Sequence, residues 1–162
     1  MKNLPNQFYY SEKEDRLNVI SHGTGFVLSI IGLVFLINKG LQDFDITRFS
    51  SFIIYGMSLS TMYIASTLYH NSKTPKSRYN FRLFDMISIY LLIAGSYTPF
   101  TLTVLIDDGG LILFALVWLI AFFGIIKSAD YSGSIAFIDL TMDSASIAVS
   151  YTHLTLPTNR EV

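Results

Sequence analysis

Four long apolar runs, separated by short polar segments, most constrain what this chain can fold into. They cover residues 17–37, 49–69, 86–106 and 110–126. A helix needs about 20 mostly apolar residues to cross the hydrocarbon core of a bilayer, and each run comes close to that length. Backbone groups inside lipid must be satisfied within the segment, which a helix achieves. The sequence therefore predicts an all-α, polytopic transmembrane helix bundle with about four spans.

The composition favours the same class of protein. Charged residues make up 14% of the chain and hydrophobic residues 51%, whereas about 25% of a soluble domain is charged. There is no cysteine, which excludes disulfide bonds and thiolate metal sites. The formal net charge of -1 gives no sign of a nucleic-acid partner. The expected partner is the lipid bilayer itself.

Basic residues are distributed unevenly among the polar segments. The amino-terminal tail and residues 70–82 lie on one side of the predicted bundle, and their basic residues are Lys2, Lys13, Arg16, Lys73, Lys76, Arg78 and Arg82. The segment on the other side, residues 38–48, holds only Lys39 and Arg48. Basic loops stay on the cytoplasmic side of a membrane. The distribution therefore predicts a multi-pass protein of the cell membrane with a cytoplasmic amino terminus.

A row of polar residues leads into the first span. Its members, spaced three or four residues apart or adjacent, are Asp15, Asn18, Ser21 and His22. Such spacing places side chains on one face of a helix. The row can cap the helix and meet the lipid headgroups, or it can face the interior of the bundle, where polar groups at membrane depth are usually functional. The spacing alone leaves both readings open.

A second polar group lies where the second span ends and the third begins. Ser66 and His70 are one helical turn apart, and Asp85 precedes the third apolar run. His70 can be a solvated interfacial imidazole or a metal ligand, and Asp85 can cap a helix or support a metal-bound water. We place the candidate chemistry here, with Asp85 and Ser66 as candidate catalytic residues and His70 as a candidate metal ligand. A catalytic zinc usually has three protein ligands, more than these residues provide.

These polar residues belong to four blocks of characteristic spacing: Asp15-x-x-Asn18-x-x-Ser21-His22-Gly23, Ser66-Thr67-Leu68-Tyr69-His70, Arg82-Leu83-Phe84-Asp85, and residues 89–100. The blocks resemble the hemolysin III family, the bacterial branch of the progestin and adipoQ receptor superfamily. The resemblance covers residues 14–127. It implies a seven-helix bundle, of which this chain holds about four spans, and a zinc ion near the cytoplasmic side.

The resemblance also implies roles for individual residues. His70 corresponds to a zinc ligand, and Asp85 to a residue that contacts the metal through a water molecule. A pair of histidines in the last helix of the family has no counterpart, because the other histidines here are His22, in the first block, and His153. We therefore expect zinc in full-length relatives, and weak or no zinc binding by this chain as written.

The sequence after Lys127 departs from the family pattern. Residues 135–149 are apolar but interrupted by Asp139 and Asp143, which makes them a poor span. Residues 149–162 read like translated sequencing-adaptor DNA, and we interpret them as a possible artefact. The predicted organisation is a membrane helix bundle over residues 1–127 and an atypical tail over residues 128–162.

Two classes of function fit these observations. The first is a zinc-dependent membrane hydrolase, in which a metal activates water against an amide or ester of a lipid at the cytoplasmic side. The second is a membrane-perturbing, cytolytic protein, or a receptor or signalling protein, without catalytic turnover. The sequence does not decide between an enzyme and these alternatives.

The charge distribution makes a testable prediction about topology. The chain has no cysteine, so single cysteines introduced at Asn71 and at Asp45 report only their own positions. In intact cells, an impermeant thiol reagent should label the cysteine at Asp45 and should reach that at Asn71 only after lysis. Labelling of both cysteines from the same side would contradict the predicted topology.

Overall fold

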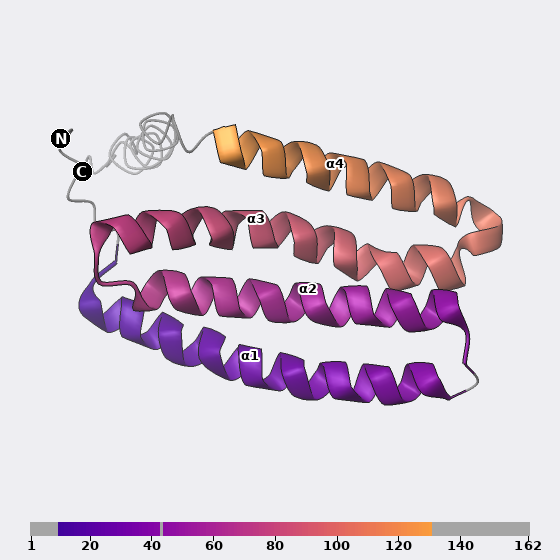
Figure 1. Cartoon of the computed structure of the whole chain (residues 1–162), viewed down its shortest axis with the longest axis horizontal. Coiled ribbons are helices and arrows are strands. Elements are labelled where there is room, and N and C mark those ends of the chain that lie inside the picture. The colour runs from indigo at the N-terminus through magenta and orange to yellow at the C-terminus, as the bar shows by residue number, and fades with distance from the viewer. Residues whose placement is uncertain (1–9, 43, 131–162) are drawn as a thin grey trace, which may run out of the picture. The chain divides into compact units, whose positions relative to one another are not determined.

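The computed structural model describes residues 10–42 and 44–130, which form a series of helices (Figure 1). The α-helices are α1 (Glu12–Leu41), α2 (Ile46–Asn71), α3 (Pro75–Pro99) and α4 (Gly110–Asp130). A π-helical turn, η1 (Phe100–Val104), and a 3₁₀ turn, η2 (Ile106–Asp108), join α3 to α4. Four helical segments are long and apolar enough to cross a membrane. The predicted all-α, polytopic fold is confirmed, while most of the predicted tail lies outside the described residues.

The start of α1 is fixed by a capping box. The hydroxyl of Ser11 accepts a hydrogen bond from the Glu14 backbone N–H at 3.3 Å, and the Glu14 carboxylate accepts one from the Ser11 backbone N–H at 2.7 Å. Together these bonds satisfy two of the free donors at the helix end. The helix therefore begins before the apolar run, and both Asp15 and Asn18 are helical.

The connection between α2 and α3 is shorter than the sequence suggested. We expected a basic loop over residues 70–82, but α2 continues to Asn71 and α3 begins at Pro75. Thr74 caps α3 by accepting a hydrogen bond from the Ser77 backbone N–H at 3.3 Å, and proline suits the first helical position. The expectation was wrong because charge was taken as a sign of a loop, although the cap and the proline mark a helix start. As a result, Arg78 and Arg82 lie on α3.

Small residues allow α2 to pack closely against both of its neighbours (Figure 1). A Cβ atom on Gly56 would come within 2.5 Å of Leu33 on α1. One turn further along, the Ser29 hydroxyl donates a hydrogen bond to Ser60 Oγ at 3.0 Å. Inside a bilayer the hydrophobic effect does not drive helices together, so they associate through close packing, and small residues let their backbones approach. The pair Gly56 and Ser60 thus lies in the α1–α2 interface.

Helix α4 packs against α3 through side chains. The indole of Trp118 donates a hydrogen bond to Thr98 Oγ1 at 3.1 Å, and Gly124 lies against the ring of Tyr90. Pro99 ends the regular part of α3 because it cannot donate to a carbonyl in the preceding turn, and the π-helical turn follows directly. Gly109, with a φ of 85°, then reverses the chain into α4.

The α2–α3 contact makes a prediction about stability. A Cβ on Gly95 would meet the side chain of Ser58, with 2.7 Å to its Cβ, whereas a Cβ on Gly32 would meet nothing within 4 Å. Alanine favours a helix over glycine by about 1 kcal/mol at either position. We expect Gly95→Ala to be less stable than Gly32→Ala by about 1–3 kcal/mol, because it overpacks the interface. Unfolding of both variants in mixed detergent micelles tests this, and equal stabilities would contradict it.

Candidate functional site

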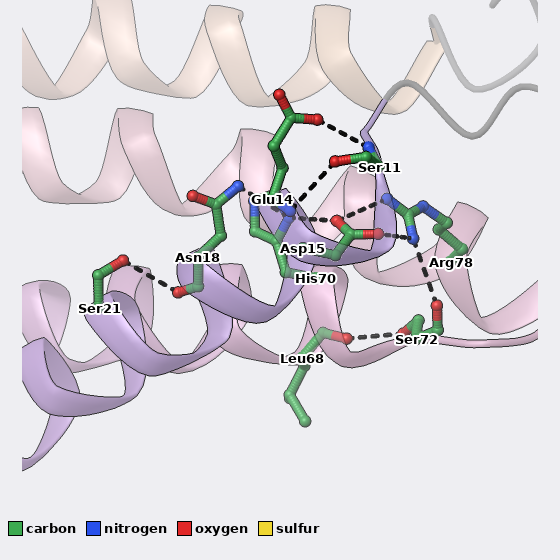
Figure 2. Close-up of polar contacts among 9 residues, drawn as sticks. All are labelled: Ser11, Glu14, Asp15, Asn18, Ser21, Leu68, His70, Ser72 and Arg78. Carbon is green, nitrogen blue, oxygen red and sulfur yellow. Dashed lines mark hydrogen bonds and ion pairs between the residues drawn. The ribbon is translucent and has the colours of Figure 1, made fainter.

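One carboxylate joins three helices at the end of the bundle where α1 and α3 begin (Figure 2). Asp15 on α1 accepts two hydrogen bonds from the Arg78 guanidinium on α3, at 2.8 Å from Nη1 to Oδ2 and 3.0 Å from Nη2 to Oδ1. Its Oδ1 also lies 2.9 Å from Nδ1 of His70, on α2. Bidentate arginine–carboxylate pairs are among the strongest hydrogen-bonded contacts in proteins. Asp15 therefore fixes the three helices relative to one another at this end.

These charged groups are largely withdrawn from solvent. The side chains of Asp15, His70 and Arg78 are 15%, 8% and 10% exposed. The guanidinium of Arg78 also lies over the ring of Tyr69, 5.1 Å from its centroid. Charges at this depth are tolerated only when they are paired with good geometry, because their desolvation is costly. The network satisfies that condition.

The Asp15 contact decides which nitrogen of His70 carries the proton. An ionised carboxylate can only accept hydrogen bonds, so Nδ1 of His70 must be the protonated nitrogen. In the neutral ring, Nε2 is then the acceptor, free to bind a proton, a water molecule or a metal. The amide nitrogen of Asn18 lies 3.5 Å from the same Nδ1, but both atoms then carry hydrogens, so this contact is not a hydrogen bond.

A second histidine lies against the first. The rings of His22 and His70 are stacked, with centroids 5.9 Å apart and an interplanar angle of 23°. Nδ1 of His22 is buried and has no hydrogen-bond partner among the described residues. A buried polar atom without a partner costs free energy, so this nitrogen is a natural point of contact for a further group.

Asp85 lies close to both histidines. Its carboxylate lies close to the hydroxyl of Ser66 and interacts electrostatically with His22 and His70. Ser66 itself is buried, 4% exposed. The structure therefore brings Ser66, His70 and Asp85 together from α2 and α3, which is the grouping that the sequence suggested.

The polar residues at the start of α1 do not all face the same way. Asp15 and Asn18 lie beside His70, and the ring of His22 is stacked on it. Ser21, in contrast, is exposed and donates a hydrogen bond to the Asn18 backbone carbonyl at 3.1 Å (Figure 2). Ser21 therefore takes no part in the cluster. We call the assembled group the polar centre; its members are Asp15, Asn18, His22, Ser66, His70, Arg78 and Asp85.

Arg78 is the member that sequence analysis did not identify, because it was counted only as a basic loop residue. The signal was the pair Thr74-Pro75, which starts α3 early enough to make Arg78 helical. Arg78 and Asp85 are then seven residues apart, which places them on the same face of the helix. Recognising that cap would have predicted that Arg78 faces the bundle.

The polar centre does not by itself form a complete metal site. Within residues 10–42 and 44–130, no group of three histidine, aspartate or glutamate side chains is placed to hold a metal ion. His70 can offer Nε2, and Asp85 can offer a carboxylate oxygen. A zinc ion bound here would need ligands from beyond the described residues.

The fold and the polar centre define a multi-pass membrane protein with ionisable groups at one end of its helix bundle. The pattern of the family described as Haemolysin-III related matches residues 10–154. The chain belongs to this family.

Two curated relatives agree with that assignment. The chain is 41% identical to Hemolysin-3 of Bacillus cereus over 114 residues, which cover 70% of this chain and 52% of the relative. It is 39% identical to the Hemolysin-3 homolog of Bacillus subtilis (strain 168) over 117 residues, or 72% of this chain and 55% of the relative. The chain thus spans about half the length of the curated relatives it matches. No solved structure is significantly similar to it.

The three-helix network makes a prediction about stability. Asp15→Asn removes the charge that pairs with Arg78 and leaves that guanidinium buried against a neutral amide. We expect a loss of about 2–4 kcal/mol in the free energy of unfolding, measured by circular dichroism during titration with a denaturing detergent.

The matched control is Glu12→Gln, which removes an exposed acid from the same helical turn. Its effect should stay within about 1 kcal/mol, because it loses only an interaction with the helix dipole. If the two variants were equally stable, the ion pair would contribute nothing to holding the helices together.

Proposed function

We propose that the full-length protein is a zinc-dependent hydrolase that acts on amides or esters of lipids at the cytoplasmic side of the cell membrane. One observation carries the proposal: Ser66, His70 and Asp85 converge at one end of the spanning helices, beside a second histidine. Ionisable groups at membrane depth are expensive and usually mark a functional site. The basic residues gathered at this end support its cytoplasmic location.

The residues of the polar centre suit the handling of a water molecule. The carboxylate of Asp85 can accept a proton from water, and the Ser66 hydroxyl close to it can donate a hydrogen bond to that carboxylate. Asp15 and Arg78 hold the His70 ring so that Nε2 is the acceptor. These groups can therefore bind and orient a water molecule and accept its proton.

Zinc would add a Lewis acid and a water of lowered pKa. The described residues do not complete a site for it, so its remaining ligands would come from elsewhere in the full-length protein. Both the zinc and the lipid substrate are therefore proposals for the complete protein.

The alternative is a protein that perturbs membranes without turnover. It is favoured by the name Hemolysin-3, which two relatives carry. In that case the polar centre would serve to hold the helices together, and leakage of vesicles would be independent of Asp85.

The test uses two forms of the protein in vesicles: the chain as written, and the chain extended by the genomic reading frame downstream of codon 127. Release of fatty acid from acyl-amide and acyl-ester lipids is measured beside leakage of an entrapped dye. For the extended form we expect hydrolysis that falls at least about 100-fold in Asp85→Asn, the scale of a lost proton-transfer group. Ser96→Ala, which changes an exposed hydroxyl on the same helix, is the control and should leave the rate unchanged.

Metal analysis of the same samples decides the role of zinc. We expect stoichiometric zinc only in the extended form, lost on His70→Ala. Dye leakage without hydrolysis would favour the alternative function. Zinc bound by the chain as written, and lost in both His70→Ala and His22→Ala, would show that the ligand assignment is wrong.

A further inference from the structure

An open groove lies beside the polar centre, where α1 and α3 begin and α2 ends. Its volume is about 930 Å³, within the range of ordinary small-molecule sites, and Asp15, His70 and Arg78 form part of its wall. The rest of the lining comes from the outer turns of the same helices and from the short α2–α3 connection. The groove therefore stands at the level where a spanning bundle meets the lipid headgroups.

The groove carries a small excess of positive charge. Three basic side chains line it, against two acidic ones, Glu12 and Asp15. Asp15 is neutralised by its bidentate contact with Arg78. The other two basic residues, Arg16 and Lys73, make no hydrogen bond or ion pair with any residue that the structure describes. Two cationic groups that line the groove, one on α1 and one on the α2–α3 connection, are thus available to an anion.

One wall of the groove is apolar. Val19 and Ile20 line it, and Ile20 is 59% exposed. Both belong to the first apolar run, so this wall continues from the groove along the membrane-spanning part of α1. A phosphate held by Arg16 and Lys73 would leave its attached hydrocarbon beside these side chains.

We propose that this groove binds one anionic phospholipid, with its phosphate between Arg16 and Lys73 and the first part of an acyl chain along Val19 and Ile20. Basic residues at the membrane surface attract anionic lipids, and the apolar wall distinguishes a lipid from a free anion. The four residues that we propose hold the lipid are not among those that we assign to hydrolysis, although His70 lines the same groove. The lipid site therefore holds whether or not the protein turns lipid over.

The experiment measures lipid retention by the whole chain in a neutral detergent, using native mass spectrometry. The probes are phosphatidylglycerol, phosphatidylcholine with the same acyl chains, and glycerol phosphate as the soluble headgroup. The test variant is Arg16→Ala with Lys73→Ala. The control is Lys13→Ala with Lys76→Ala, which removes the same charge from the same end but from residues that do not line the groove.

We expect the protein to retain one phosphatidylglycerol in preference to phosphatidylcholine. The affinity for phosphatidylglycerol should fall by about 10–30-fold in the test variant and not in the control, because each basic residue contributes roughly fivefold to the affinity. Ile20→Ser should weaken retention of the lipid as well, because it removes part of the apolar wall. Circular dichroism of each variant establishes that the helices are intact.

Three results would overturn the proposal. Equal losses in the test and control pairs would mean that the protein attracts anionic lipid only through diffuse surface charge. Displacement of the lipid by an equal concentration of glycerol phosphate would show a site for a free phosphate. Equal retention of phosphatidylcholine would remove the role of the two cations. Hydrolysis by the extended protein is measured separately, so its failure is distinguishable from each of these results.

Discussion

The contact of Asp15 with Arg78 and His70 is the interaction on which the site depends. The carboxylate lies on α1, the imidazole on α2 and the guanidinium on α3, so the network joins three spans at one end. Burying any of these groups without its partners would cost free energy. The position of each helix therefore depends on the positions of the other two. The same contact sets the tautomer of His70. The packing of the bundle and the chemistry of its polar centre are therefore consequences of one arrangement.

Along the rest of the spans, association depends on close approach. Gly56 lies against Leu33, and Gly95 against Ser58, at positions where a larger residue would push the helices apart. Serine and threonine hydroxyls in α2 and α3 bond mostly to carbonyls of their own helix, as Ser60 does to Gly56 and Thr98 to Ala94. Such local bonds let polar residues occupy tight interfaces without an unsatisfied donor. The outer face of α1, including Val27 and Phe35, remains apolar and exposed, as lipid contact requires.

The polar centre and the groove beside it divide the end of the bundle where α1 and α3 begin into two chemical environments. In the first, Ser66, His70 and Asp85 lie close together and are largely shielded from solvent. In the second, Arg16 and Lys73 stand at an open surface next to an apolar wall. Asp15, His70 and Arg78 form the boundary between them, because all three belong to the polar centre and also line the groove. A lipid bound in the groove would therefore lie next to the groups that we propose carry out hydrolysis.

The sequence by itself determined the class of fold. Apolar runs of about 20 residues can cross a bilayer as helices, which satisfy their backbone hydrogen bonds within the segment. Its blocks also determined the family and pointed to Ser66, His70 and Asp85. The tertiary structure decided which of these side chains contact one another. It showed that Asp15 binds Arg78 and His70, and that Ser21 faces away from the centre. Periodicity places a residue on a face of its own helix, but which side chains meet depends on how the helices are rotated and where each begins. The start of α3 at Pro75, which brings Arg78 to Asp15, is the clearest case.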